Sequence, residues 1–510
     1  MKYLKNWKIM SGVILIAVLL CPHHYFIDGN ILWGEIVKNI FFTIGIFIFG
    51  NIFTYLIENV KLKDYSKEKK IAKYLTILSF YLIPFIIIGI EWIQCFPANL
   101  STDSYVQLQQ IYSNNYSDVH PAAQTLFCKL LMCIYNSPAT VIFFQILFLS
   151  IITGYGFQYF YNRGISKKIL IPILLLWSSL GPVRIITCYF WKDVFYTIGI
   201  LALTIVFIIT IEKKEKTNVK TLILGGIALA VIALFRHNGM LVFVCLLPIF
   251  ICWTIKFHKQ SFIIPIGISI GIIAITKMFI YGYFGVMPND NGTKYALPAK
   301  AIVSVVYYDG NYTDEELEKI EQLMPKEYIK KYYDSEIGEG MLWRTVDTAN
   351  VPTFSKTLNG KEKLIIELFF ELLPKNMGIM IKDMWDSTSL MLRFQYDDKK
   401  LFANQELVNS SIGKNVPYGS FLEHNMTYLF VLLICIVMLI KHERKYEIIA
   451  FAPMLLNVLS VVISNISYEA RYAYPTICCS AILIIYTIYS ISREKNHIDI
   501  LQKVEKGDNI

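Results

Sequence analysis

Charged residues are scarce in this sequence. Asp, Glu, Lys and Arg together make up 17% of its 510 residues, and 55% of the residues are hydrophobic. Soluble domains average about 25% charged residues. Several apolar runs reach the length of about 20 residues that a membrane-spanning helix needs. The composition therefore excludes the string of soluble domains that the length alone would suggest, and it predicts an all-α polytopic membrane protein.

Several motifs with a defined chemistry are also absent. The sequence has no glycine-rich phosphate-binding loop, no nucleotide-binding domain and no serine-hydrolase elbow, so any activated substrate has to come from elsewhere. Its ten cysteines include no CxxC pair and no zinc spacing, and most lie in apolar runs, where cysteine acts as a small hydrophobe. Near predicted external helix ends a disulfide is allowed, but no spacing supports a particular pairing, and the cysteines there are Cys95, Cys128, Cys133 and Cys188.

The net charge of +9 does not indicate a nucleic-acid partner, because Lys and Arg gather at the ends of apolar runs. There they set the orientation of membrane helices. Every basic cluster falls on one side of the predicted topology, which places both termini in the cytoplasm. A bias toward Ile, Lys, Asn and Tyr is associated with an AT-rich bacterial genome, so the expected location is a bacterial plasma membrane. The twelve predicted spans are 9–26, 36–58, 73–93, 138–161, 168–184, 190–211, 219–236, 238–256, 261–285, 425–441, 446–466 and 472–492.

This topology divides the chain into four parts. Residues 1–285 form a transmembrane core with an external loop at 94–137. Residues 286–424 form an extracytoplasmic and mostly helical domain. Residues 425–492 form the C-terminal membrane helices, and residues 493–510 form a cytoplasmic tail. In the loop, apolar spacing over Pro121–Asn136 predicts a helix lying in the membrane interface.

The extracytoplasmic domain has local signals of its own. Thr313 and Glu316 predict a capping box at a helix start. Ala301–Tyr308 carries the only strand-like signal of note, and an amphipathic helix at 361–373 is expected to stop at Pro374, with another at 377–394.

The stretch Asn99–Pro121 is a polar, acidic and aromatic island between the apolar runs, and it holds Asp103, Asp118 and His120. Asp103 fits a general base, a metal ligand or a helix cap. Asp118 and His120 fit either a turn, since Asp and Pro are turn formers, or two ligands of a divalent metal whose third ligand is not visible. No cofactor is certain from these residues.

Charged residues also gather at the predicted external ends of the membrane helices. Charges near the membrane centre are energetically costly and often mark functional sites. At a helix end, each of these side chains could reach water on its own by extending its charged tip to the membrane surface. Cations that converge from three separate turns on one face are better explained by a shared anionic ligand, and a lipid phosphate is the natural candidate. The residues are Arg184, Lys192, Asp193, Arg236, His237, Glu469 and Arg471.

The first external loop resembles that of the GT-C superfamily of membrane glycosyltransferases, which includes protein O-mannosyltransferases and aminoarabinose transferases. Asp103 matches the catalytic acid, and Asp118, His120 and Pro121 match a DxHPPL-like segment, although Ala122 and Ala123 replace its second Pro and Leu. The remaining motifs are similar to those of a poorly characterised bacterial family of that superfamily, namely Trp191-Lys192-Asp193, the turn with Arg236, Asn238 and Gly239, and Arg471-Tyr472 with Pro475.

The resemblance implies inverting sugar transfer from a polyprenyl-phosphate donor to an extracytoplasmic glycan, lipid or protein acceptor. Asp103 would be the base, and Lys192, Arg236 and Arg471 would stabilise the leaving phosphate. Asp118 and His120 would orient substrates. Two alternatives stay open: a polysaccharide polymerase or ligase of the O-antigen type, and a transporter or flippase of lipid-linked sugars, although the inverted repeats typical of transporters are not apparent.

Overall fold

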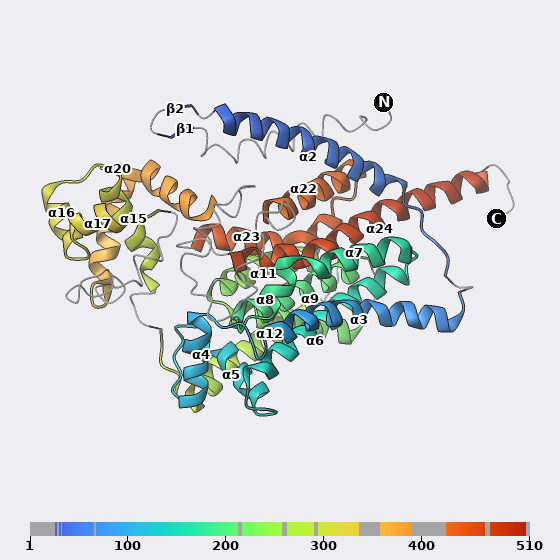
Figure 1. Cartoon of the computed structure of the whole chain (residues 1–510), viewed down its shortest axis with the longest axis horizontal. Coiled ribbons are helices and arrows are strands. Elements are labelled where there is room, and N and C mark those ends of the chain that lie inside the picture. The colour runs from blue at the N-terminus through green and yellow to red at the C-terminus, as the bar shows by residue number, and fades with distance from the viewer. Residues whose placement is uncertain are drawn as a thin grey trace.

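Helices make up nearly all the regular structure of the computed structural model (Figure 1). The structure describes residues 26–27, 30–31, 33–65, 68–212, 217–257, 263–289, 294–335, 358–389, 425–464 and 470–505. Within these ranges the only strands are β1 (Phe26–Ile27) and β2 (Asn30–Ile31), two residues each, which pair antiparallel. The predicted all-α class is therefore confirmed.

Six helical segments of the described chain are long and apolar enough to cross a membrane. This finding supports the predicted multi-pass membrane protein. The segments are α3 (Lys70–Gln94), α6 (Pro138–Tyr161), α9 (Lys192–Glu212), α12 (Ile263–Ile275) with η4 (Thr276–Ile280) and α13 (Tyr281–Tyr283), η7 (Glu447–Phe451) with α23 (Ala452–Ser464), and η8 (Ala470–Ala473) with α24 (Tyr474–Glu505).

Other predicted spans also coincide with helices. They are α2 (Trp33–Asn59), α10 (Val219–Phe235), α11 (His237–Phe257) and α22 (Asn425–Lys441). In the described part of the chain, α10, α22 and the portion His237–Cys252 of α11 are apolar but shorter than the six segments above. The predicted span 9–26 lies almost wholly outside the described residues. Helix α24 continues to Glu505, past the predicted end of the last span at 492.

The predicted span 168–184 is not one straight helix. It consists of α7 (Lys167–Ser179) and α8 (Gly181–Thr187), which meet at an angle of 58°. Pro182 lies in the first turn of α8, a position that tolerates its missing N–H group. As one broken span the pair would be a seventh crossing. The bend brings the chain after α8 against the loop that follows α3, because Asn99 N donates to Cys188 O at 2.9 Å.

Helices α9 and α24 form the centre of the bundle. Nearly all their apolar residues are buried, whereas α3 and α12 expose apolar side chains such as Ile86 and Ile270. A helix that is apolar all round and buried belongs to the core of a large or membrane protein. The exposed apolar sides of α3 and α12 are therefore the surfaces that suit contact with lipid.

The described part of 286–424 is helical and has a hydrophobic core separate from that of the bundle. Its helices are α15 (Ala296–Tyr307), α16 (Asp314–Glu321), α17 (Lys326–Tyr332) and α20 (Glu362–Ser389). They lie together at one end of the molecule in Figure 1. The predicted capping box is confirmed, because Glu316 N donates to Thr313 Oγ1 at 3.2 Å and Thr313 N donates to Glu316 Oε2 at 2.8 Å.

Two local predictions in this block were wrong. The strand-like run Ala301–Tyr308 belongs mostly to helix α15, which buries Ile302, Val303 and Val306 in the local core, so tertiary packing overrides the β-propensity of its branched residues. The helix that starts at Glu362 does not stop at Pro374 but kinks at Asn376. Asn376 Nδ2 donates to Leu372 O at 3.1 Å, so this backbone carbonyl has a hydrogen-bond partner at the kink.

Candidate functional site

Helix α4 (Thr102–Ser113) places Asp103 in its first turn. Ser101 is the N-cap residue, and its backbone N–H donates to Ser104 Oγ at 3.0 Å. The cap role weighed for Asp103 therefore falls to Ser101, and the Asp103 carboxylate points elsewhere. A carboxylate in the first turn also interacts favourably with the helix dipole.

Backbone pairing holds the start of this loop against the segment between α8 and α9. Asn99 forms an isolated parallel bridge with Tyr189, and Phe190 N donates to Asn99 O at 3.0 Å. The indole Nε1 of Trp191 donates to Ser101 Oγ at 2.6 Å. These contacts bring Lys192, the first residue of α9, to Asp103.

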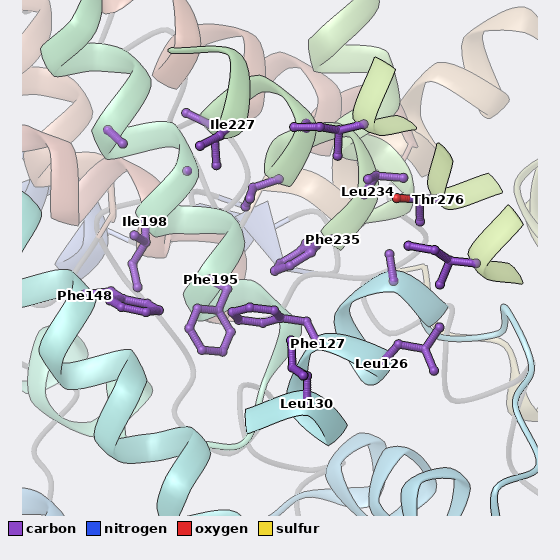
Figure 2. A pocket seen from close by; sticks show the side chains of 18 of the residues that line it. Leu126, Phe127, Leu130, Phe148, Phe195, Ile198, Ile227, Leu234, Phe235 and Thr276 are labelled. Atoms are coloured by element: carbon purple, nitrogen blue, oxygen red, sulfur yellow. The ribbon is translucent and has the colours of Figure 1, made fainter. Parts of the chain in front are cut away.

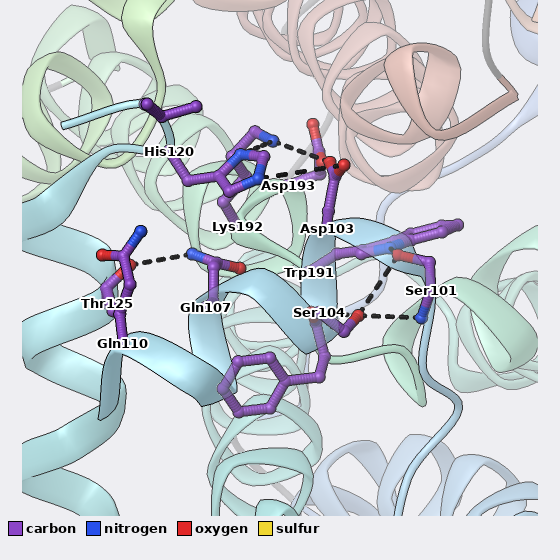
Figure 3. Close-up of polar contacts among 12 residues, drawn as sticks. Ser101, Asp103, Ser104, Gln107, Gln110, His120, Thr125, Trp191, Lys192 and Asp193 are labelled. Atoms are coloured by element: carbon purple, nitrogen blue, oxygen red, sulfur yellow. Dashed lines mark hydrogen bonds and ion pairs between the residues drawn. The ribbon is translucent and has the colours of Figure 1, made fainter. Parts of the chain in front are cut away.

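Asp103 lies at the centre of a cluster of charged groups from four segments. Its Oδ2 accepts from Arg471 Nη1 at 2.7 Å and from Lys192 Nζ at 3.1 Å. His120 Nε2 lies 3.9 Å from Asp103 Oδ1, and His120 Nδ1 lies 3.3 Å from Lys192 Nζ. Figure 3 shows Asp103, His120 and Lys192 turned toward one another. The structure thus unites three residues that the sequence places far apart.

A second layer lies behind this cluster. Asp193 is fully buried, with Arg236 Nη1 3.3 Å from its Oδ1 and Arg471 Nε 3.8 Å from its Oδ2. The guanidinium of Arg236 stacks 4.4 Å from the ring centre of Tyr472, and that of Arg471 lies 5.1 Å from the ring centre of Trp191. Aromatic faces stabilise a desolvated cation. Asp193 is therefore a positioning anchor for two arginines.

The turn that carries Arg236 is tight. Arg236 is extended between α10 and α11, and Gly239 lies so close to α10 that a Cβ atom there would be 1.9 Å from Ile232 O. Only glycine fits such an approach. Asn238 Nδ2 donates to Ser460 Oγ of α23 at 3.0 Å. The sequence motif at this turn thus fixes the position from which Arg236 reaches Asp193.

The electrostatics of the cluster favour a charged Asp103 and a neutral His120. Burial raises the pKa of Asp103, but Arg471, Lys192 and His120 outweigh it and hold that pKa well below the ordinary value. Burial, together with Lys192, lowers the pKa of His120 to about 3 against the opposing effect of Asp103. A neutral imidazole offers one donor and one acceptor.

Cations surround both carboxylates of the cluster. Among the described residues, and with His120 neutral, its contacts join three cations to two carboxylates. The side chain of Asp103 is 26% exposed, whereas those of Arg471 and Asp193 are 5% and 0% exposed. The exposed side of the cluster is therefore suited to an anion with two or more oxygens, which could contact Lys192 and Arg471 together.

Asp118 lies apart from the cluster. Its Oδ1 accepts from Ala122 N at 2.9 Å and from the Tyr281 hydroxyl at 3.2 Å, and its Oδ2 lies 3.1 Å from Lys277 Nζ. The predicted turn is present, because Asp118 caps the start of α5 (Ala122–Met132). The carboxylate orients the turn and so sets the position of His120.

The remaining predicted residues have other places. Arg184 pairs with Glu91 of α3, away from the cluster. His237 Nε2 contacts Val119 O at 3.1 Å, beside the same turn, and Glu469 lies outside the described residues. Within the described ranges, no three His, Cys, Asp or Glu side chains converge in a way that could hold a metal ion.

Lys277 and Tyr281 were missed in the sequence. Lys277 belongs to the π-helical segment η4 (Thr276–Ile280), and Tyr281 directly follows it. π-helical turns occur frequently at functional sites. A lone lysine inside the apolar run 261–285 is the signal that could have identified Lys277, since charges in such runs are costly.

An apolar cavity of about 720 Å³ lies between α5, α6, α9 and α10. Figure 2 shows its wall of aromatic and aliphatic side chains from α5, α6, α9 and α10. Three lining residues, Ala123, Phe195 and Phe235, follow or precede His120, Lys192 and Arg236 closely in the chain. The cavity and the cluster are therefore built on the same helix ends.

No protein-family model matches this chain, and neither the curated proteins nor the solved structures contain one with significant similarity to it.

Proposed function

We propose that the protein is a membrane glycosyltransferase of the GT-C type, which transfers a sugar from a polyprenyl-phosphate donor to an extracytoplasmic acceptor with inversion. The observation that carries the proposal is the cluster in which Asp103, partly exposed, contacts Lys192 and Arg471. It offers a carboxylate base and fixed cations for a phosphate leaving group within one site. The enzyme would act in cell-envelope glycan or glycoconjugate synthesis.

The proposed topology has twelve spans in a bacterial plasma membrane, with both termini in the cytoplasm. It places the loop 94–137 and the block 286–424 outside, on the face where lipid-linked sugars are consumed without a nucleotide. The absence of a nucleotide-binding motif in the sequence is consistent with a lipid-linked donor.

The reaction needs one base and one stabilised leaving group. Asp103 would take the proton of the acceptor hydroxyl as that oxygen attacks the anomeric carbon. The bond from the sugar to the phosphate oxygen breaks at the same time, and Lys192 and Arg471 would stabilise the charge that develops on the phosphate. His120, neutral at physiological pH, would hold the acceptor or the phosphate by a hydrogen bond.

Donor binding would also activate the base. In the resting protein the cations that Asp103 contacts hold its pKa well below the ordinary value, which makes it a weak base. A phosphate that takes over contacts with Lys192 and Arg471 would relieve this stabilisation, and the pKa of Asp103 would rise toward the value that proton transfer requires. The base would thus become effective when the donor is in place.

A single carboxylate is sufficient for inversion. The other carboxylate of the cluster, Asp193, is fully buried between two arginines, which leaves it poorly placed to attack a sugar. The apolar cavity, whose lining residues Phe195 and Phe235 are close in the chain to Lys192 and Arg236, has the size of ligand sites in proteins, and it would accommodate the first part of the polyprenyl chain.

The proposal is tested by sugar transfer in membranes that contain the full chain, with a panel of polyprenyl-phosphate sugars. Asp103→Asn keeps the size of the side chain but removes the base, so we expect release of free lipid phosphate to fall about 10²- to 10⁴-fold. Asp314→Asn, which removes an exposed carboxylate of α16, is the matched control and should keep the wild-type rate.

Equal activity of Asp103→Asn and wild type, at equal abundance, would overturn the role of Asp103. If the wild type uses no donor of the panel, a transport assay with the same lipids tests the flippase alternative, and accumulation of longer glycan chains tests the polymerase alternative.

A further inference from the structure

Two helices that carry the site end side by side, each with a cysteine at its C-cap. Cys95 follows α3 directly and Cys188 follows α8 directly. An ion pair between Glu91 and Arg184 joins the last turns of the same two helices, and the backbone bond from Asn99 N to Cys188 O joins the segments that follow them. Contacts before and after the cysteines therefore hold the two helix ends together.

Both thiols lie against the end of α3, because Cys188 Sγ is 3.9 Å from Ile88 O and Cys95 Sγ is 3.6 Å from Trp92 O. Cys188 is buried, and Cys95 is partly exposed. An oxidant in the surrounding water can therefore reach Cys95 first, while Cys188 is shielded at the adjoining helix end. This is the arrangement of an attacking thiol and a resolving thiol.

The two thiols also differ in pKa. The neighbouring Cys188 lowers the pKa of Cys95, whereas Cys95 and burial raise the pKa of Cys188. Because the thiolate is the nucleophile, Cys95 is the group that reacts first. The pKa difference agrees with the order that exposure indicates.

We propose that Cys95 and Cys188 form a redox-active disulfide that ties the loop carrying Asp103 to the segment carrying Lys192. Both cysteines lie on the side that the proposed topology places outside the cytoplasm, where disulfides persist. The inference rests on that topology, but it does not require the proposed transferase activity.

The oxidant is a small-molecule or protein disulfide. The Cys95 thiolate attacks one sulfur of the oxidant, which forms a mixed disulfide and releases the first thiol. Cys188 then loses its proton and attacks the Cys95 sulfur, which forms the Cys95–Cys188 bond and releases the second thiol. The two cysteines lose two electrons and two protons in total, and the oxidant gains them.

The bond would strengthen a connection that noncovalent contacts now make. The pairing of Asn99 with Tyr189 and the bond from Trp191 to Ser101 hold Asp103 near Lys192. Opening of the loop requires these bonds to break, and a covalent tie at the base of the loop would limit how far it opens. Reduction would release that limit.

The test uses the full chain in native membranes, treated with oxidised glutathione, alkylated with N-ethylmaleimide and digested for mass spectrometry. We expect a linked peptide pair that contains Cys95 and Cys188, and its loss after dithiothreitol. Cys133, which is exposed, is the internal control and should appear alkylated or singly glutathionylated.

Two variants separate the steps. Cys188→Ala should stop at the Cys95–glutathione mixed disulfide, and Cys95→Ala should leave Cys188 without a glutathione adduct because it is buried. A mixed disulfide on Cys95 in the wild type with no linked pair, or two free thiols after treatment, would overturn the proposal. The wild-type result needs no variant, so a folding defect in either variant does not affect it.

Sugar transfer is measured separately on oxidised and reduced samples. Loss of transfer in both forms, with the linked pair present, would count against the proposed function and not against the disulfide.

Discussion

Two buried clusters of charged residues can be compared in this protein: the one around Asp103 in the membrane bundle and the one around Lys300 in the block 286–424. In the second, Lys300 Nζ donates to Asp383 Oδ2 at 2.6 Å, and both side chains are 3% exposed. The hydroxyl of Tyr308 donates to Asp386 Oδ2 at 3.0 Å, and Lys382 Nζ donates to the same oxygen at 2.8 Å.

The two clusters differ in how their carboxylates are bonded. Around Lys300, Asp383 and Asp386 accept hydrogen bonds from two lysines and from tyrosine hydroxyls. Around Asp103, both Asp193 oxygens lack a hydrogen bond of good geometry, and the Asp103 side chain is 26% exposed. A buried hydrogen-bonded network fastens helices together, whereas cations beside a partly exposed carboxylate are suited to an anionic ligand.

The pKa values show the same difference. Burial raises the pKa of Asp383 and lowers that of Lys300, so desolvation dominates in the Lys300 cluster. At Asp103 the neighbouring cations outweigh burial. Burial alone therefore does not mark a site, and the cations around a partly exposed carboxylate are the more informative feature.

The largest effect should come from removing a cation of the Asp103 cluster. Arg471→Gln keeps a polar side chain but loses contacts to Asp103 and Asp193, so we expect lipid-phosphate release to fall about 10³-fold, as for loss of a group that stabilises a transition state. Arg444→Gln, in an ion pair with Glu447, is the control. A fall of the same size in both variants would contradict a specific role of Arg471 in transfer.

Lys300→Met should act on stability instead. It leaves the buried Asp383 without its cation, so we expect a loss of about 3 kcal/mol in the free energy of unfolding, while transfer per folded molecule stays near wild type. Limited proteolysis of the purified protein in denaturant measures the change. Lys382→Met, whose side chain is 48% exposed, should cost far less, and equal losses would contradict the assignment.

The pH dependence of transfer tests whether His120 stays neutral in the folded protein. Because its pKa is about 3 in the folded protein and about 6.5 in the unfolded chain, His120 stays neutral from pH 8 down to about 4. The unfolded chain binds a proton at this residue below about pH 6.5, so the His120 contribution to stability falls as the pH is lowered through 6.5 toward 3.

We therefore expect His120→Asn to lower transfer about tenfold at every pH from 5.5 to 8, by loss of one hydrogen bond to substrate. The pH–rate profiles of variant and wild type should superimpose after scaling. An acidic limb near pH 6.5 that is present in the wild type and absent from the variant would show that His120 titrates, contrary to this expectation.

The smallest effect is expected from Lys277→Met. Lys277 is 42% exposed and pairs with Asp118, and exposed ion pairs contribute at most about 1 kcal/mol. Transfer should fall roughly threefold, with a change in KM larger than that in kcat. Lys319→Met, in an exposed pair with Glu315, should change neither constant.

The predictable part of the site came from local signals. Polar residues between apolar runs identified Asp103 and His120, and basic residues at helix ends identified Lys192, Arg236 and Arg471. The role of each residue was less predictable. Arg184 has the same sequence signature as Arg236, yet it pairs with Glu91, because the bend between α7 and α8 directs it toward α3.

The errors in the fold have a similar origin. Ala301–Tyr308 is rich in β-branched residues, but its helix packs on α20, and Pro374 is accommodated by a kink whose Asn376 also bonds to the backbone of Asn311 at 2.8 Å. In both cases a partner distant in sequence decided the local structure, and no window of neighbouring residues contains that information.

The sequence by itself determined that this protein is helical and crosses a membrane several times, because hydrophobicity and helix length act locally along the chain. It also determined which residues carry charge at the helix ends. Only the tertiary structure decided which charges meet: it brings Asp103, Lys192 and Arg471 together, pairs Asp118 with Lys277, and places Cys95 against Cys188. Electrostatic and thiol chemistry depend on distances of a few ångströms between segments that lie far apart in sequence, and packing alone sets those distances.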